Sequence, residues 1–330
     1  MENAGRARRR SITTAPVPPA AARGAPPASV DTVPPMERDV ALIVNPAAGG
    51  GRALRALPDS ERALRAAGLR VRLEHTRDIE HARELGRAAG AAGEVAAALG
   101  GDGLVGAVAD GLRLAADDGS RDGVLAILPG GRGNDFARTL GIPRNPARAA
   151  AAIANGRERA IDLGVCGERA FVGIASCGFD SDANRIANDT RVPGDAAYLY
   201  GALRALAGWR PARFELELDG ERVEHVGYSV AAANGRQYGG GMVLAPDAAL
   251  DDGVFDVVTV GDVSKGRFLR ALPRVFRGAH VRNDEVTVRR ARELTIAADR
   301  PFALYADGDP IAELPATVRT LPAAVRVIVP

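Results

Sequence analysis

From residue 40 onward, the chain alternates short apolar runs with longer amphipathic stretches. Strands are predicted at 40–44, 71–74, 95–99 and 124–128, and helices at about 54–67, 79–89 and 105–115. This alternation is typical of a parallel sheet covered by helices on both faces, which binds its ligands at the carboxyl ends of the strands. The loops that follow Val44, Leu99 and Leu128 are therefore the first candidates for a site.

From about Ile161 the pattern changes to extended segments separated by tight turns. These segments are predicted at 169–175, 213–218, 223–233, 254–260, 286–288, 293–297 and 323–329, with helices at 196–208 and 266–279. Extended runs joined by turn sequences such as Asp219-Gly220 are typical of antiparallel sheets. We therefore expect an α/β protein of two domains: a Rossmann-like parallel domain at 37–160 and a mostly antiparallel, β-rich domain at 161–330.

Residues 1–36 differ from both parts. They combine early arginines with a stretch rich in proline and alanine that shows no apolar periodicity. Such a composition buries too little surface to order itself, so a disordered tail is expected. A basic tail can bind acidic surfaces, but a solvated terminus is the favoured interpretation.

Composition excludes several classes of protein. The net charge of +2 is too small to attract nucleic acid, so no nucleic-acid partner is expected. Cys166 and Cys177 form neither a disulfide framework nor a metal-ligand spacing, which fits a reducing, cytoplasmic compartment. No apolar run approaches the ~20 residues of a spanning helix, so membrane contact should be peripheral, at the inner face.

The chain contains a single lysine, Lys265, and every other basic side chain apart from histidine is arginine. A P-loop needs a lysine after its second glycine, and a protein kinase needs one on a strand beside the phosphates. Lys265 follows Val263-Ser264 and fits neither design. If the protein uses ATP, backbone amides, arginine and metal must hold the phosphates.

All three candidate loops are rich in glycine, at 45–51, 100–103 and 129–135. Glycine allows the backbone to approach closely, so that amides converge on phosphate oxygens near helix N-termini. Ordinary tight turns are the alternative. The 101–106 segment also matches a dinucleotide-binding pattern, but the next strand lacks the acidic residue that holds a ribose. A nicotinamide-dependent enzyme therefore stays a minor alternative.

The order and spacing of six motifs make the family recognisable. They are Asn45-Pro-x-x-Gly49, Gly100-Gly-Asp-Gly103, Gly133-Asn-Asp-Phe-Ala-Arg138, Gly178-Phe-Asp180, Gly239-Gly-Gly241 and Ala306-Asp-Gly308. Over residues 38–330 the chain resembles the diacylglycerol kinase catalytic family of bacterial lipid kinases and sphingosine kinases. The related NAD kinases share the second motif, whereas the third favours the lipid branch. The resemblance implies an ATP-dependent lipid kinase of phospholipid metabolism, and the lipid itself stays unidentified.

The resemblance also implies the ligands, ATP and Mg²⁺, and the residues of the site. ATP would contact Asn45, Pro46, Gly49, Thr76, Gly100, Gly101, Asp102, Gly103, Leu104, Gly106, Gly131, Arg132, Gly133 and Asn134. Magnesium on the nucleotide would be organised by Asp78, Asp102 and Asp135, and a second, structural magnesium would be held by Ala249, Asp252 and Val254. The catalytic base would be Asp307 or Asp309. As alternatives, Asp78 and Asp135 could be helix N-caps, and Asp252-Gly253 an ordinary turn.

Several positions depart from the family pattern. Leu104, Gly106 and Ala107 replace a hydroxyl, an amide and a carboxylate, and Asp309 replaces a glutamate. Arg132 replaces a threonine and could bind phosphate or face solvent. These losses keep open a degenerate domain that senses nucleotide or lipid without turnover.

One segment suggests a membrane partner. On a helical wheel, Arg267, Arg270, Arg274 and Arg277 share one arc, and apolar side chains occupy another. The 265–282 segment is thus expected to dock on anionic membrane, although packing of the apolar face on the second domain is the favoured alternative. The four histidines show no ligand spacing and are expected in ordinary surface or core roles. The oligomeric state is not readable, and a homodimer stays open.

Overall fold

The computed structural model describes residues 39–120, 123–190, 192 and 196–330, so the tail expected at 1–36 lies outside the described residues. The first part is a parallel sheet with helices. Its strands are β1 (Asp39–Val44), β2 (Arg70–His75), β3 (Val95–Gly100) and β4 (Val124–Pro129), in the spatial order β2-β1-β3-β4. Its helices are α1 (Ala48–Ala66), α2 (Ile79–Ala91), α3 (Asp102–Asp117), α4 (Asp135–Thr139) and α5 (Pro146–Ile153).

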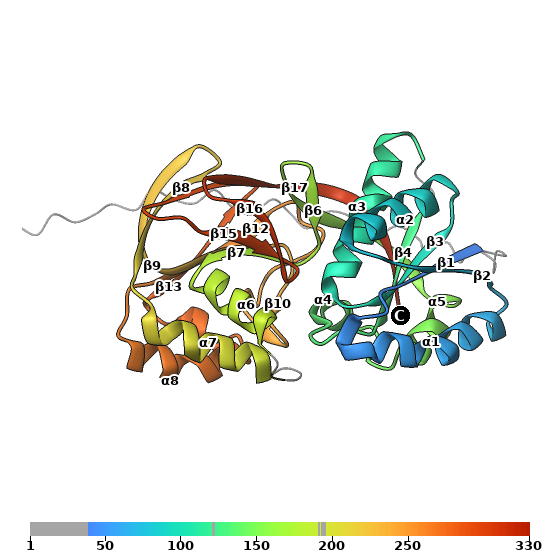
Figure 1. Ribbon diagram of the computed structural model, residues 1–330. Coiled ribbons are helices and arrows are strands. Elements are labelled where there is room, and N and C mark those ends of the chain that lie inside the picture. Colours follow the sequence, from blue (N-terminus) through green and yellow to red (C-terminus); the bar gives the residue numbers. More distant parts are fainter. Residues whose placement is uncertain (1–38, 121–122, 191, 193–195) are drawn as a thin grey trace, which may run out of the picture. The chain divides into compact units, whose positions relative to one another are not determined.

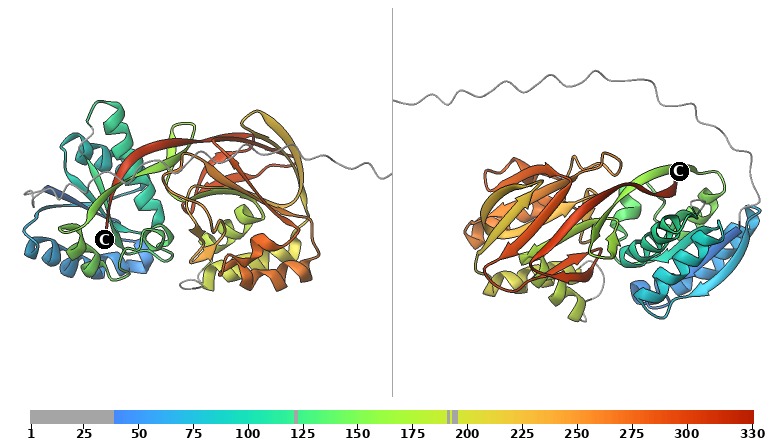
Figure 2. Two further views of the ribbon diagram at one scale, coloured as in Figure 1. Left: turned by 180° about the vertical axis from the view of Figure 1, so that it is seen from behind. Right: turned by 90° about the horizontal axis from the view of Figure 1, so that it is seen from above.

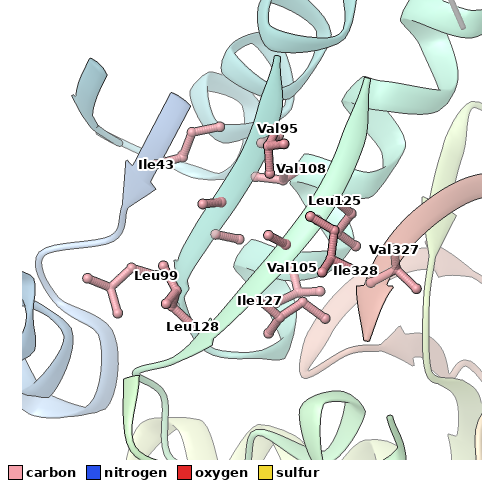
Figure 3. Close-up of a cluster of buried hydrophobic side chains, with 14 of the residues drawn as sticks. Ile43, Val95, Leu99, Val105, Val108, Leu125, Ile127, Leu128, Val327 and Ile328 are labelled. Carbon is pink, nitrogen blue, oxygen red and sulfur yellow. The ribbon is translucent and has the colours of Figure 1, made fainter. Parts of the chain in front are cut away.

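The helices cover both faces of this sheet. Figure 1 shows α1 and α5 on one face and α2 and α3 on the other. Every residue of β3 and β4 is buried, as expected for strands covered on both sides. Figure 3 shows how Leu99, Leu125 and Leu128 of the strands meet Val105 and Val108 of α3 in one apolar core. This part of the fold confirms the parallel α/β prediction.

The second part is antiparallel and rich in strands. Its main strands are β5 (Arg157–Cys166), β6 (Arg169–Phe171), β7 (Ile174–Gly178), β8 (Ala212–Leu218), β9 (Glu221–Ala233), β12 (Phe255–Gly261), β13 (Val286–Ala291), β14 (Glu293–Ala298), β15 (Ala303–Ala306), β16 (Asp309–Glu313) and β17 (Ala316–Val329). A separate small hairpin pairs β10 (Gln237–Tyr238) with β11 (Met242–Val243). The β-rich prediction is likewise confirmed.

Three helices gather on one side of these strands, as Figures 1 and 2 show. They are α6 (Phe179–Asp189), α7 (Ala196–Gly208) and α8 (Lys265–Val275), and a short 3₁₀ helix, η1 (Ala279–Arg282), follows α8. The core beneath them is aromatic: the Phe179 ring packs edge-on against the rings of Trp209 and Phe268 at 5.5 and 4.9 Å between centroids. Among the described residues, no helix is both long and apolar enough to cross a membrane.

The long strand β17 joins the two sheets. It pairs antiparallel with β14 and with β5, and at Val327 it pairs parallel with Leu125 of β4. Val327 and Ile328 therefore belong to the core of the parallel sheet, as Figure 3 shows. Residue 160, where the sequence pattern changes, lies within β5.

Some predicted boundaries were wrong, for identifiable reasons. The predicted strand 169–175 is two strands, β6 and β7, because the amides of Val172 and Gly173 turn away to bind a carboxylate. The predicted helix 266–279 ends at Val275, since Gly278 takes a left-handed conformation. Helices α5 and α6 were not predicted, because α5 is short and α6 is largely polar, and a helix at α4 was raised only with the alternative that Asp135 is an N-cap.

Candidate functional site

The three glycine loops are built against one another. The Gly130 amide donates to the Gly100 carbonyl at 2.7 Å, which fastens the third loop to the second. A Cβ on Gly131 would lie 2.3 Å from the Gly101 Cα, and one on Gly49 would lie 2.5 Å from the Gly130 oxygen. Contacts this short tolerate no side chain. The glycines are therefore required by the approach of the backbones, and the three loops form one unit.

This unit lines an open cavity of about 420 Å³, which we call the loop pocket. Of the predicted ATP and magnesium residues and the predicted bases, those that line it are Asn45, Gly49, Thr76, Asp78, Gly101, Asp102, Gly103, Leu104, Gly131, Arg132, Gly133, Asp307 and Asp309. The loop pocket thus brings together most of the site that the sequence indicated, from segments far apart in the chain.

Other predicted residues lie outside the lining of this pocket. They are the nucleotide residues Pro46, Gly100, Gly106 and Asn134 and the magnesium residues Asp135, Ala249, Asp252 and Val254. Asn134 has a structural task instead: its carboxamide accepts a hydrogen bond from the Gly131 amide at 2.8 Å and donates to the Gly131 carbonyl at 3.1 Å. With φ of 52°, Asn134 takes a left-handed conformation and closes the loop. It thereby fixes the shape of the third loop, whose Gly131 lines the pocket.

Asp102 fixes the start of α4. The two oxygens of its carboxylate accept hydrogen bonds from the amides of Asp135 and Phe136, at 3.1 and 3.0 Å. Burial, followed by the negative charge of Asp135, raises the pKa of Asp102 to about 6. Both effects disfavour the charged form of the carboxylate, and the positive charge of Arg138 opposes them only in part.

Asp135 is the first residue of α4 and not its N-cap, because Asn134 occupies that position. The alternative that Asp135 caps a helix is therefore wrong. Its carboxylate pairs with Arg138 and accepts a hydrogen bond from the Gly240 amide at 2.8 Å. Burial raises the pKa of Asp135. Gly240 belongs to the Gly239–Gly241 motif, so this bond links the third glycine loop to the β10–β11 hairpin.

Asp78 does cap a helix. Its side chain accepts a hydrogen bond from the His81 amide at 2.8 Å at the start of α2, while the residue also lines the loop pocket. The capping alternative is confirmed, and one carboxylate oxygen remains for another partner. A role in holding magnesium stays a prediction.

The donors beside the loop pocket fit a nucleotide-bound magnesium ion. Over the described ranges, no group of three or more His, Cys, Asp or Glu side chains is arranged to hold a metal alone. Asp102 and Asp135 are nonetheless two adjacent carboxylates whose mutual repulsion a cation would relieve. Mg²⁺ in kinases is commonly held by one or two carboxylates, with substrate phosphates and water completing its shell.

The predicted structural magnesium segment shows a different pattern. The Asp252 carboxylate pairs with Arg290 and accepts from the Val254 amide at 3.3 Å. The next residue, Gly253, is anchored through its amide to the buried Asp162 carboxylate at 2.7 Å. These contacts are those of the ordinary turn at Asp252-Gly253, and Arg290 is already paired with the Asp252 carboxylate. Magnesium binding at Ala249, Asp252 and Val254 stays a prediction.

Asp307 is held by the backbone. Its carboxylate accepts hydrogen bonds from the amides of Val172 and Gly173 at 2.8 and 2.9 Å, and burial raises its pKa to about 7. Cβ atoms on Gly106 and Gly173 would each lie 2.6 Å from its oxygens. The absence of side chains at Gly106 and Gly173 therefore leaves room for the Asp307 carboxylate.

Asp309 lies two residues further along, at the start of β16. A Cβ on Gly103 would lie 2.6 Å from its Oδ2 atom, so this carboxylate packs against the second glycine loop. Burial raises its pKa, and the positive charge of Arg169 works in the opposite direction. Both candidate bases thus lie at the loop pocket, on opposite sides of Gly308.

A small connecting cavity of about 50 Å³ leads away from the carboxylates. It shares Asp102, Asp307 and Gly308 with the loop pocket. It shares Asn184, Tyr238 and Gly239 with a third cavity in the β-rich part, which we call the apolar pocket. The three cavities therefore follow one another without a break in their lining.

The apolar pocket lies among α6, α7, α8 and the strands beneath them. Its walls are mostly aliphatic and aromatic, from residues such as Phe179, Leu244, Phe268 and Leu272. Its volume is about 100 Å³, below the ~300 Å³ usual for small-molecule sites, so a long ligand requires an outward shift of the wall. No residue of α8 is buried, which makes this helix the wall that can move most easily.

The polar end of this pocket contains Asp180. The Tyr238 hydroxyl donates to the Asp180 carboxylate at 3.2 Å, and burial raises the pKa of Asp180 to about 7. The sequence singled out the Gly178-Phe-Asp180 motif but assigned it no role. It gave no signal at all for Tyr238, Asn184 or Gly173, because these residues carry no recognisable motif of their own.

Comparisons with known proteins agree with this architecture. The family model described as the diacylglycerol kinase catalytic domain matches residues 39–166, and the YegS C-terminal NAD kinase beta sandwich-like domain matches residues 173–329. A diacylglycerol kinase of Mycobacterium tuberculosis is 37% identical over 301 residues, which cover 88% of this chain and 95% of the relative. A diacylglycerol kinase of Bacillus subtilis is 31% identical over 238 residues, covering 71% of this chain and 77% of that protein.

A solved structure gives the same result. The crystal structure of a diacylglycerol kinase from Bacillus anthracis matches with a TM-score of 0.73 and 26% sequence identity, over 89% of this chain and 97% of that one. The similarity in sequence and in structure thus extends over both parts of the fold, and this chain belongs to the diacylglycerol kinase family.

Proposed function

We propose that the protein transfers the γ-phosphate of ATP to the hydroxyl group of a lipid. One observation carries this proposal: the loop pocket, the connecting cavity and the apolar pocket share lining residues in sequence. A polar cavity suited to phosphates and an apolar cavity suited to hydrocarbon thereby adjoin the same small cavity. Buried carboxylates lie at the junction.

The loop pocket would hold the phosphates mainly through the backbone. Amides of the glycine loops and the N-terminus of α3 present partial positive charge to an anion. Arg132 lies exposed at the rim, and it has no hydrogen bond or ion pair with any other residue that the structure describes. Its guanidinium is therefore available to a phosphate oxygen. Magnesium, when bound at Asp102 and Asp135, would supply neutralising charge on the phosphates.

Asp307 fits the role of base better than Asp309. Asp307 lines both the loop pocket and the connecting cavity, whereas Asp309 lines the loop pocket but not the connecting cavity. A lipid hydroxyl arriving from the apolar side therefore reaches Asp307. The Asp307 carboxylate takes the hydroxyl proton while the oxygen bonds to the γ-phosphorus, and the bond between that phosphorus and the bridging oxygen breaks to release ADP. A pKa of about 7 suits a base at neutral pH.

Transfer of labelled phosphate tests this function. Purified protein, Mg²⁺ and γ-labelled ATP are mixed with micelles containing diacylglycerol, a sphingoid base, ceramide or phosphatidylglycerol. We expect one lipid class to become labelled and the Asp307→Asn variant to lose the activity. Nucleotide and lipid binding with no labelled product from any lipid would instead support the degenerate sensor.

Helix α8 provides a route by which a lipid in a membrane reaches the apolar pocket. Its inward side chains Phe268, Ala271, Leu272 and Val275 line the apolar pocket, so the alternative of packing on the second domain is partly correct. Leu269 on its outward side and Phe276, directly after its last residue, are 41% and 51% exposed. Neighbouring α7 adds exposed Leu199, Tyr200 and Leu203. We propose that this surface docks on anionic membrane and that the lipid enters the pocket beside α8.

The arginines of α8 are not equivalent. Arg267 forms two hydrogen bonds with the Glu285 carboxylate, at 3.1 and 2.7 Å, so its charge is already paired. Arg270 donates to the Gly266 carbonyl and Arg274 to the Asn283 side chain, both neutral partners. The proposed contact with anionic lipid therefore rests on Arg270 and Arg274 of α8 and on Arg277, which follows the helix.

A further inference from the structure

His280 differs from the other polar side chains of the apolar pocket. It lies in η1, it is only 3% exposed, and it lines the pocket. Within the part of the chain that the structure describes, neither of its ring nitrogens has a hydrogen-bond partner. The Leu244 backbone lies near the ring without meeting the geometry of a hydrogen bond, and it partly opposes the lowering of the His280 pKa by burial. A buried imidazole with both nitrogens unmatched is rare in native proteins and requires an explanation.

Three of the other polar side chains around the pocket are already engaged, and Asn184 and Ser229 also line it. Asp180 accepts from Tyr238, Asn283 accepts from Arg274, and Glu285 pairs with Arg267. Burial lowers the pKa of His280, so its ring is neutral near pH 7 and offers one N–H donor and one acceptor. His280 is thus a hydrogen-bonding group in the lining of a pocket whose walls are mostly apolar.

Its place in the row of cavities limits what it can bind. His280 lines the apolar pocket but not the connecting cavity, where Asp307 lies. A lipid whose hydroxyl reaches Asp307 would therefore meet His280 with a more remote part of the molecule, along its hydrocarbon. The polar atom that recurs there in acyl lipids is the carbonyl oxygen of an ester or amide.

We propose that His280 determines substrate specificity by donating a hydrogen bond from its ring to the carbonyl oxygen of an ester- or amide-linked acyl chain. This inference rests on the proposed function, because it takes the apolar pocket to be the lipid site. A site built to hydrogen-bond a substrate group discriminates against an analogue that lacks the group, since its own buried donor is then left unpaired. The predicted substrate class is thus acyl lipids, in preference to ether lipids or simple long-chain alcohols.

A pair of short lipids tests this directly. Dioctanoylglycerol and its dioctyl ether have the same chains and hydroxyl, but in the ether each carbonyl is replaced by a methylene. We expect wild-type kcat/KM to favour the diacyl lipid by about tenfold. His280→Phe keeps a planar aromatic ring but has no nitrogen, so it should bring the ratio of the two kcat/KM values close to one. His280→Gln retains an N–H donor and should restore part of the preference.

A matched control separates recognition from damage to the pocket. Val275→Ala alters an apolar wall residue and should lower kcat/KM for both lipids equally, so that the ratio of the two values is preserved. An unchanged ratio in His280→Phe, or no preference in the wild type, would overturn the proposal.

Binding distinguishes failure of this inference from failure of the proposed function. The chain has one tryptophan, Trp209, and its ring packs on Phe179, which lines the pocket. Fluorescence of Trp209 therefore reports lipid binding without any turnover. Selective binding of the diacyl lipid that is lost in His280→Phe would support the inference even if no lipid were phosphorylated. Equal binding of both lipids by the wild type would count against it.

Discussion

The loop pocket and the apolar pocket are constructed in opposite ways. The loop pocket is shaped by backbone: its three glycine loops meet at distances that exclude a Cβ atom at Gly49 and Gly131. The apolar pocket is shaped by side chains, with the rings of Phe179 and Phe268 at its wall. A site made of backbone is fixed by a few positions that accept no substitute. A site made of side chains can be enlarged, narrowed or retuned by ordinary substitutions.

The strongest test of this difference removes the carboxylates at the junction. Asp307→Asn should lower kcat by about 10²–10⁴-fold with little change in the affinity for ATP, because a base acts mainly in the transition state. Asp309→Asn should cost less, since Asp309 does not line the connecting cavity. Equal losses in the two variants, measured by steady-state kinetics, would contradict the assignment of Asp307 as base.

Asp102→Ala should also abolish turnover, for a different reason. The Asp102 carboxylate holds the amides of Asp135 and Phe136, so its loss should disorganise the third loop and weaken nucleotide binding as well as kcat. Calorimetric titration with ATP measures this directly, and circular dichroism checks that the fold persists. Normal activity in Asp102→Ala would remove the nucleotide site from the loop pocket.

A single methyl group should break the backbone-built site. Gly131→Ala places a Cβ 2.3 Å from the Gly101 Cα, so the second and third loops must separate. We expect a loss of about 1–3 kcal/mol in the free energy of unfolding and weaker ATP binding. Gly208→Ala is the matched control, because a Cβ there meets no atom within 4 Å. Wild-type ATP affinity in Gly131→Ala would show that the loops do not need this contact.

The apolar pocket, which is built of side chains, should respond to a change in side-chain volume alone. Ala271→Trp fills the apolar pocket from α8 and should raise the KM for the lipid about tenfold, equivalent to about 1.4 kcal/mol of binding, with ATP affinity unchanged. Leu269→Trp, on the exposed side of the same helix, is the control for the added ring. If both variants altered lipid KM equally, the pocket would not be the lipid site.

The smallest expected effect concerns the surface outside the apolar pocket. Replacing Arg270, Arg274 and Arg277 by glutamine should reduce co-sedimentation with anionic vesicles at low salt, at about 1 kcal/mol per arginine. Glutamine at Arg62, Arg65 and Arg222 removes the same charge from other exposed positions and should leave binding intact. Equal binding by the two triple variants and the wild type would exclude docking through α8.

The same contrast explains what could be predicted from the sequence. Glycine loops at strand ends leave a local signature, so the residues around Gly101 and Gly131 could be named before the structure was known. The walls of the apolar pocket leave none, because Phe179, Leu244 and Phe268 are separated in the chain and each resembles an ordinary core residue. His280 was expected in an ordinary role for that reason. Only folding reveals that its nitrogens lack partners.

The family resemblance and the α/β fold class were confirmed, whereas connections governed by long-range contacts were missed. The break between β6 and β7 depends on Asp307, a residue more than 130 positions away in the chain. Likewise, the affiliation of Val327 with the parallel core could not be read from its own apolar run, which looks like any strand of the β-rich part.

That affiliation has a consequence for how the protein is made. Strand β4 pairs with β17, which follows all the other elements of the β-rich part in the chain. During synthesis, the β4 edge of the parallel sheet must therefore stay uncovered until Val327 has been made, and an uncovered edge is a site for wrong pairing. A separately expressed fragment of residues 39–166 would carry the same unfinished edge permanently. The parallel sheet of the first part is thus incomplete without β17. Separating the two parts therefore requires a strand that replaces β17 beside β4.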